Sequence, residues 1–106
     1  MTDVPAPIQA MVDATNAGDS DAFVASFTAD AYLEDWGRGF TGPEEIRSWD
    51  QTDNIGKRAH FEVLAIRSDG ADHIATVRTT GGGFNGDSDI RFTLADGKIA
   101  RLIIAP

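Results

Sequence analysis

The chain contains no cysteine among its 106 residues. This absence excludes a disulfide framework, a thiolate metal site and a cysteine nucleophile, and it favours a reducing, cytoplasmic location. The first residues, MTDVPAPIQ, lack the basic start and the apolar core of a signal peptide, and Arg101 interrupts the apolar stretch at 99–105. We therefore expect an untargeted protein with no membrane partner.

Positive charge is also scarce, because nine lysines and arginines stand against seventeen aspartates and glutamates, for a net charge of −8. Such a chain repels a phosphate backbone and gains little from counterion release, so no nucleic-acid partner is expected. A hydrophobic content of 42% is typical of a packed globule. The length predicts a single domain over residues 1–106, with residues 1–5 frayed.

Three helices are predicted in the first half of the chain. PAPIQAMVDATNAG begins with two prolines, continues with apolar side chains at helical spacing and ends at Gly18. GDSDAFVASF predicts a second short helix, capped by Asp19 or Ser20. A third helix is expected in TGPEEIRSW, where Thr41 stands three residues before Glu44 as in a capping box.

Strand-like patterns follow the helices. AYLEDW at 31–36 alternates apolar and polar side chains, and GRGFTGP is expected to break it. From Arg58 onward, four runs rich in β-branched and aromatic residues are separated by DGAD, GGGFNG and DG, which favours a meander of four antiparallel strands. The sequence therefore predicts an α+β domain in which helices cover one face of a sheet.

A glycine-rich segment and two histidines resemble parts of known binding sites, but neither is predicted to form one. GGGFNG at 81–86 matches the spelling G-x-G-x-x-G, yet no helix follows it, so we expect a flexible hairpin loop with Phe84 as a lid over a pocket. His60 and His73 lie near the starts of two different strands, at opposite ends of the pair, and have no third ligand at a recognisable spacing. No metal site is predicted.

Asp35 ends the strand AYLED on the face that Ala31 and Leu33 share. A carboxylate at the end of an apolar stripe is desolvated, which makes it usable as a general base. An aspartate that closes a turn or caps a helix explains the pattern equally well. Trp36 and Trp49 flank the connection from this strand to the third helix, and they suit either an apolar cleft or the core.

The order of these segments resembles the nuclear-transport-factor-2-like superfamily, which includes SnoaL-like polyketide cyclases and ketosteroid isomerases. The resemblance rests on GD between the helices, ADAYLED on the first strand and GPEEI at the third helix, and it spans roughly residues 8–104. It implies a cone-shaped α+β fold with three N-terminal helices packed on a strongly curved, mainly antiparallel sheet. It also implies a small, apolar, carbonyl-bearing ligand. Because this fold hosts many functions, the activity has to be argued from the site.

The resemblance to ketosteroid isomerases assigns roles to single residues. In that family an aspartate on the matching strand removes a proton next to a carbonyl, and AYLED places Asp35 there. A protonated aspartic acid donates to the enolate, and counting back eight residues from Gly97 reaches Asp89. The tyrosine donor of the first helix falls on Met11, which cannot donate a hydrogen bond. Losing one such donor costs about 3–4 kcal/mol.

The direction of the strand around Asp89 decides two further expectations. If Asp89 faces the interior, Arg91 does too, and Ile90 and Phe92 face outward, where a homodimer through the outer sheet face would cover them. If Ile90 and Phe92 face inward, Asp89 is a surface acid. Together with Asp35, the pair Asp89 and Arg91 also resembles the water-activating Asp-Arg-Asp set of limonene epoxide hydrolases.

Three functions remain open on the sequence. The first is a cofactor-free isomerase or cyclase that removes a proton next to a carbonyl, with Asp35 as base and with Asp89 and Arg91 stabilising the oxyanion. The second is a non-catalytic ligand-binding or dimerisation module. The third is epoxide-hydrolase-like water activation by the same three residues. The residues expected to line the pocket are Met11, Leu33, Trp36, Trp49 and Phe84.

Overall fold

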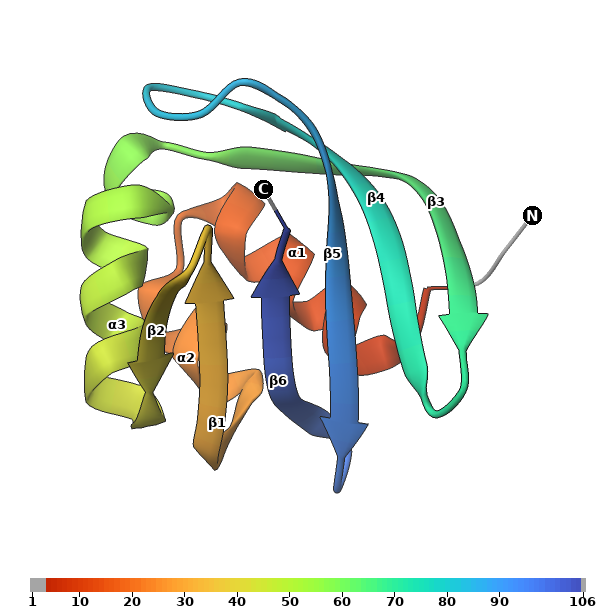
Figure 1. Ribbon diagram of the computed structural model, residues 1–106. Helices are drawn as coiled ribbons and strands as arrows, with labels where there is room; N and C mark the ends of the chain where they lie inside the picture. Colours follow the sequence, from red (N-terminus) through yellow and green to blue (C-terminus); the bar gives the residue numbers. More distant parts are fainter. Residues whose placement is uncertain (1–3, 106) are drawn as a thin grey trace.

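The computed structural model describes residues 4–105. Along the chain the elements are α1 (Ala6–Ala17), α2 (Ser20–Ala25), β1 (Phe27–Asp35), β2 (Arg38–Thr41), α3 (Gly42–Asp53), the short 3-10 helix η1 (Ile55–Lys57), β3 (His60–Asp69), β4 (Asp72–Thr80), β5 (Gly86–Ala95) and β6 (Lys98–Ile104). The three α-helices lie on one side of the sheet, which curves around them (Figure 1). This confirms the predicted fold class.

The strands form one sheet in the order β2-β1-β6-β5-β4-β3. The strands β3 to β6 form the predicted antiparallel meander, whereas β1 pairs with β6 in parallel. This parallel pair places Asp35, at the end of β1, beside Ile104, at the end of β6. The sheet topology therefore sets Asp35 at the edge where both strands stop.

One strand was not expected from the sequence. Instead of a break at GRGFTGP, Arg38–Thr41 forms β2, which pairs with β1 across a two-residue turn. The turn residues Trp36 and Gly37 have φ values of 51° and 83°. A type I′ hairpin turn requires positive φ at both of its central positions. A bulky residue rarely adopts this conformation, so Trp36 concealed the turn signal. The strand β1 also begins earlier than predicted, at Phe27.

The predicted helices are present, with one difference in capping. Gly18 ends α1 in the left-handed conformation, and the Asp19 side chain caps α2 by accepting from the Ala22 N–H at 3.1 Å. At α3 the side chain of Thr41 makes no cap, and its N–H donates to the Glu45 carboxylate at 2.8 Å. No helix within residues 4–105 is long and apolar enough to cross a membrane.

The core fills the space between the helices and the concave face of the sheet. Ile90 and Phe92 on β5 belong to it, with 3% and 0% of their surface exposed. The inward-facing alternative for this strand is therefore the correct one, and Asp89 and Arg91 lie on the outer face. Of the residues expected to be frayed, 1–3 lie outside the described part of the chain, and Val4 packs against the core.

The outer face of the sheet carries ion pairs. Arg91 Nη1 contacts Asp72 Oδ2 at 3.1 Å, and the Thr93 hydroxyl donates to Asp72 Oδ1 at 2.8 Å. The Thr93 hydroxyl, followed by the Arg91 guanidinium, holds the pKa of Asp72 below its ordinary value. Asp72 therefore stabilises the fold in its ionised form.

We expect Asp72→Asn to weaken the dependence of stability on acid. The pKa of Asp72 is lower in the folded protein than in the unfolded chain, where it is about 3.9. The stabilisation from ionised Asp72 is therefore complete above the unfolded pKa and is lost as the pH falls through the folded pKa. Thermal unfolding of the variant and the wild type between about pH 7 and about pH 3 measures it. The difference in midpoint should be small, since the pair is at the surface, and should shrink in acid. A difference that stays constant across this range would contradict the assignment.

Candidate functional site

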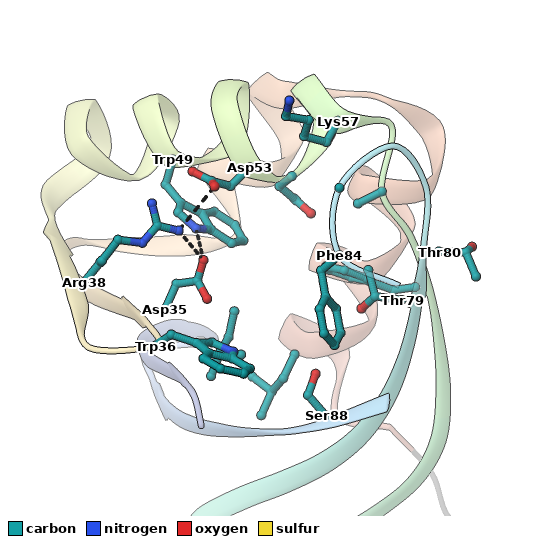
Figure 2. Close-up of a pocket in the computed structure, with 16 residues that line it drawn as sticks. Asp35, Trp36, Arg38, Trp49, Asp53, Lys57, Thr79, Thr80, Phe84 and Ser88 are labelled. Carbon is teal, nitrogen blue, oxygen red and sulfur yellow. Dashed lines mark hydrogen bonds and ion pairs between the residues drawn. The ribbon is translucent and has the colours of Figure 1, made fainter. Parts of the chain in front are cut away.

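A pocket of about 380 Å³ opens between the β1–β2 hairpin, the end of α3, η1 and the loop that joins β4 to β5 (Figure 2). Its size lies within the range of cavities that hold small molecules. Its wall combines aromatic and aliphatic side chains with polar and charged ones. The side chains on which the argument depends are Asp35, Trp36, Trp49, Thr79, Phe84 and Ser88.

Asp35 lies in the wall of this pocket, and its side chain is 17% exposed. Its Oδ2 accepts two hydrogen bonds, one from Trp49 Nε1 at 3.0 Å and one from Arg38 Nη2 at 2.7 Å. Within residues 4–105 the other oxygen, Oδ1, accepts no hydrogen bond, and in Figure 2 it is turned toward the hollow. The carboxylate is thus held at one oxygen, and the other oxygen is open to the pocket.

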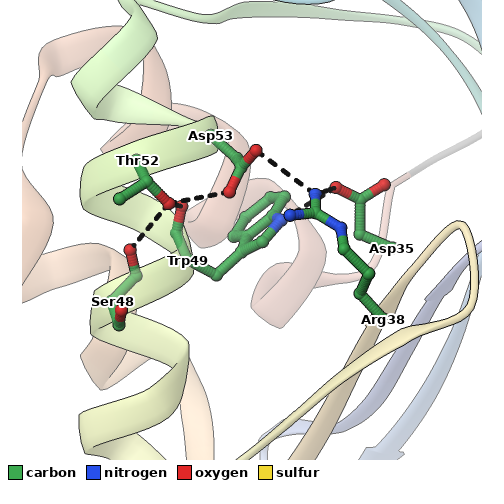
Figure 3. A network of polar contacts seen from close by, with 6 residues as sticks. All are labelled: Asp35, Arg38, Ser48, Trp49, Thr52 and Asp53. Carbon is green, nitrogen blue, oxygen red and sulfur yellow. Dashed lines mark hydrogen bonds and ion pairs between the residues drawn. The ribbon is translucent and has the colours of Figure 1, made fainter.

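The two donors come from separate elements, and each is held in turn. Trp49 is buried on α3, where its ring stacks on Phe23 with 6.0 Å between ring centroids. Arg38, on β2, also contacts Asp53 Oδ1 at 3.2 Å, and Asp53 Oδ2 accepts from the Thr52 hydroxyl at 2.7 Å (Figure 3). A helix and a hairpin together therefore orient Asp35.

Two exposed aromatic side chains flank the mouth of the pocket (Figure 2). Trp36 is 57% exposed and Phe84 is 51% exposed. Trp36 sits in the hairpin turn with φ of 51°, which is unusual for a bulky residue and is a feature that clusters at functional sites. A planar, apolar ligand can pack against these two rings.

The GGGFNG segment forms a hairpin loop, as predicted, and no helix follows it. The structure holds this loop against η1, because the Gly82 N–H donates to the Lys57 carbonyl at 2.7 Å. The Asn85 side chain donates to the carbonyls of Gly81 and Gly83 at 2.9 Å and 3.0 Å. A Cβ on Gly81 would come within 2.6 Å of the Arg58 carbonyl oxygen, so this close approach requires glycine.

The expectation that Asp89 and Arg91 join Asp35 is wrong in its geometry. Asp89 accepts from the Thr76 hydroxyl at 2.7 Å and from Arg67 at 3.5 Å on the outer face. The Thr76 hydroxyl bond, more than the Arg67 guanidinium, lowers the pKa of Asp89, whereas the expected enolate donor must stay protonated. Arg91 is engaged by aspartates on the same outer face. Neither residue lines the pocket.

Two of the five expected lining residues are also elsewhere. Met11 and Leu33 are buried in the core, with 1% and 0% of their surface exposed, and do not line the pocket. Trp36, Trp49 and Phe84 do line it.

Sequence reasoning missed seven polar residues of the pocket, Arg38, Asp53, Asn54, Lys57, Thr79, Thr80 and Ser88. Arg38 follows the concealed hairpin turn, and Asp53 lies one helical turn after Trp49, so the spacing on α3 could have indicated it. Ser88 shares the inward face of β5 with Ile90, and the apolar pattern of that strand was the available signal.

The histidines lie apart, as predicted. On the paired strands β3 and β4, His60 is opposite Thr80 and His73 is opposite Ser68, at the two ends of the ladder. Within the described residues, no three potential acidic, histidine or cysteine ligands come together at a possible metal site.

The fold and the pocket agree with the family to which the chain belongs. Residues 8–102 match the SnoaL-like domain, so this is a SnoaL-like protein of the nuclear-transport-factor-2-like group. No curated protein matches the sequence significantly.

Solved structures support the same assignment. A candidate polyketide cyclase from Sinorhizobium meliloti is 30% identical, with a TM-score of 0.81 over 95% of this chain and 94% of that chain. The Delta 5-3-ketosteroid isomerase from a Mycobacterium species is 17% identical, with a TM-score of 0.82 over 95% and 90%. A computationally designed 17-OHP binder is 16% identical, with a TM-score of 0.84 over 99% and 92%. The last two show similarity of fold alone.

Proposed function

We propose that this domain binds a small, largely apolar carbonyl compound and moves a proton next to the carbonyl, with Asp35 as the general base. The observation that carries this proposal is the placement of the Asp35 carboxylate in a pocket with aromatic side chains, anchored through Oδ2 and open at Oδ1. The polyketide cyclase and ketosteroid isomerase among its structural neighbours are consistent with it.

In the proposed reaction Asp35 Oδ1 takes a proton from the carbon next to the carbonyl, and the electron pair of that C–H bond moves onto the carbonyl oxygen. In an isomerisation the resulting enolate takes the proton back at a different carbon. In a cyclisation the enolate carbon attacks a second carbonyl, the π electrons of that carbonyl move onto its oxygen, and the new alkoxide takes the proton from Asp35. Trp49 and Arg38 keep the carboxylate in place throughout. The steps balance without a cofactor.

The conversion of 3-cyclohexen-1-one to the conjugated 2-cyclohexen-1-one tests this proposal, because it requires the same proton movement and changes the ultraviolet absorbance. The wild type should accelerate the conversion, Asp35→Asn should lose the acceleration, and Asp89→Asn on the outer face should keep it. Full activity in Asp35→Asn, or its loss in Asp89→Asn, would reject the base assignment.

The alternative is a binding module without catalysis, and the ion pair between Asp35 and Arg38 favours it, since a structural role explains this contact too. Such a module would bind cyclic ketones equally well as wild type and as Asp35→Asn, with no turnover in either. Water activation by Asp35, Asp89 and Arg91 is not carried forward, because the last two lie on the other face of the sheet.

Two broader expectations stay predictions. The cytoplasmic location rests on the cysteine-free composition. The homodimer was expected to cover Ile90 and Phe92, and both are buried within the chain, so that argument for it no longer holds.

A further inference from the structure

The pocket wall carries hydroxyl groups for which the fold provides no partner, and two of them turn into the hollow. The third, on the exposed Thr80, lies away from the hollow in Figure 2. Thr79 on β4 and Ser88 on β5 both line it, and neither hydroxyl makes a hydrogen bond within residues 4–105. Thr79 is nearly buried, with 9% of its surface exposed. By contrast, the hydroxyls of Thr76 and Thr93 on the outer face of the same strands are both bonded to aspartates.

Strand pairing sets these two hydroxyls close to each other. Ser88 is directly opposite Val77, and Thr79 is two residues further along β4 on the same inward face. Diagonal neighbours of this kind are about 7–8 Å apart at their backbones, close enough for both side chains to reach one ligand atom. In Figure 2 they lie across the hollow from Asp35, with their oxygens turned toward it.

The spacing between the hydroxyls and Asp35 suits an enolate. Two strand spacings, about 10 Å, separate β1 from the strand of Ser88, β5, and three, about 14 Å, separate β1 from the strand of Thr79, β4. A carbonyl compound held at both ends needs about 3 Å from base to carbon, about 2.4 Å from that carbon to the carbonyl oxygen, and about 2.8 Å to a donor. The sum, about 8 Å between the oxygens of base and donor, is shorter than the distance between the strand backbones, and the side chains that reach into the hollow from both sides cover the difference.

We infer that Thr79 and Ser88 form the oxyanion site of the pocket, donating to the carbonyl oxygen as charge develops on it. This inference rests on the proposed function and names the donors that Met11 and Asp89 do not supply. The donors are neutral hydroxyls, which prefer an oxygen acceptor that gains negative charge over one that stays neutral. The ligand therefore presents its carbonyl toward β4 and β5 and its acidic carbon toward β1.

Fluorine NMR titration with two matched aromatic compounds tests the proposed oxyanion site without requiring turnover. Pentafluorophenolate, measured at a pH where it is ionised, carries the oxyanion, and hexafluorobenzene has the same ring without it. The wild type should bind pentafluorophenolate at least about tenfold more tightly than hexafluorobenzene, as one charge-assisted hydrogen bond allows. Thr79→Val and Ser88→Ala should each reduce this preference, and the double variant should abolish it.

Thr76→Val is the matched control, because it removes a hydroxyl from the outer face of the same strand. It should leave the preference unchanged, and hexafluorobenzene binding should persist in all variants as proof of an intact pocket. The inference is overturned if the wild type shows no preference for pentafluorophenolate over hexafluorobenzene, or if the double variant keeps this preference. It is also overturned if only Arg38→Met removes the preference.

Kinetics separate this inference from the proposed function. In the 3-cyclohexen-1-one assay the double variant should lose about 100-fold in kcat with little change in KM. If turnover depends on Asp35 and not on the hydroxyls, the proposed function stands and the oxyanion site is rejected. If the wild type shows no turnover but its preference for pentafluorophenolate depends on the hydroxyls, the binding site stands and the reaction is rejected.

Discussion

The turnover of 3-cyclohexen-1-one is expected to fall about 1000-fold in Asp35→Asn, within the range that a positioned general base contributes. Asparagine has nearly the shape of aspartate, and its amide oxygen can still accept from the Trp49 N–H, so the pocket should keep its form. The amide cannot take up a proton from carbon. The loss should appear in kcat, with binding of the ketone preserved.

Asp53→Asn is the matched control for this experiment. It changes the other carboxylate that Arg38 contacts, and leaves Asp35, the proposed base, in place. We expect less than about a tenfold loss for Asp53→Asn, since a positioning contact is weakened and no reacting group is removed. Equal losses in the two variants would mean that the network around Arg38, and not proton transfer by Asp35, determines the rate.

Gly56→Ala is expected to cause the largest loss of stability. A Cβ at this position in η1 would lie 1.5 Å from the carbonyl oxygen of Gln51 and 2.3 Å from its carbonyl carbon. Both are backbone atoms of α3, so neither can move aside without disrupting the helix. The cost should exceed about 4 kcal/mol, which is exceptional for a single substitution, and urea unfolding measures it.

Gly83→Ala provides the comparison for Gly56→Ala. Its added Cβ would meet only side-chain carbons of Lys57, with Cβ and Cγ both at 3.3 Å. This variant should therefore lose less than about 1 kcal/mol. If Gly56→Ala unfolds at the same urea concentration as Gly83→Ala, then η1 does not pack on α3 as closely as the structure shows.

The order of the elements was predictable because each carries its own local signal. Gly18 ends the first helix, Asp19 caps the second, and the turns of the meander separate four apolar runs. The strand β2 was missed because its turn begins with Trp36 in a conformation that favours glycine or asparagine. Local chemistry thus predicted the elements wherever the turns were ordinary.

The site was predictable only in part, because successive side chains of a strand point to opposite faces of the sheet. Counting from Gly97 selects Asp89, but a difference of one residue places any strand residue on the other face. The burial of Ile90 and Phe92 fixes the phase of β5 and brings Ser88 inward. Arg38 and Asp53 meet only because α3 packs on the hairpin, and no local pattern records that contact.

The parallel pairing of β1 with β6 affects how the protein folds during its synthesis on the ribosome. Asp35 precedes its strand neighbour Ile104 by 69 residues in the sequence. Pairings between such distant segments form slowly, after the local hairpins. During translation Asp35 is therefore without its neighbouring strand, and the pocket closes around it only after β6 has left the ribosomal exit tunnel.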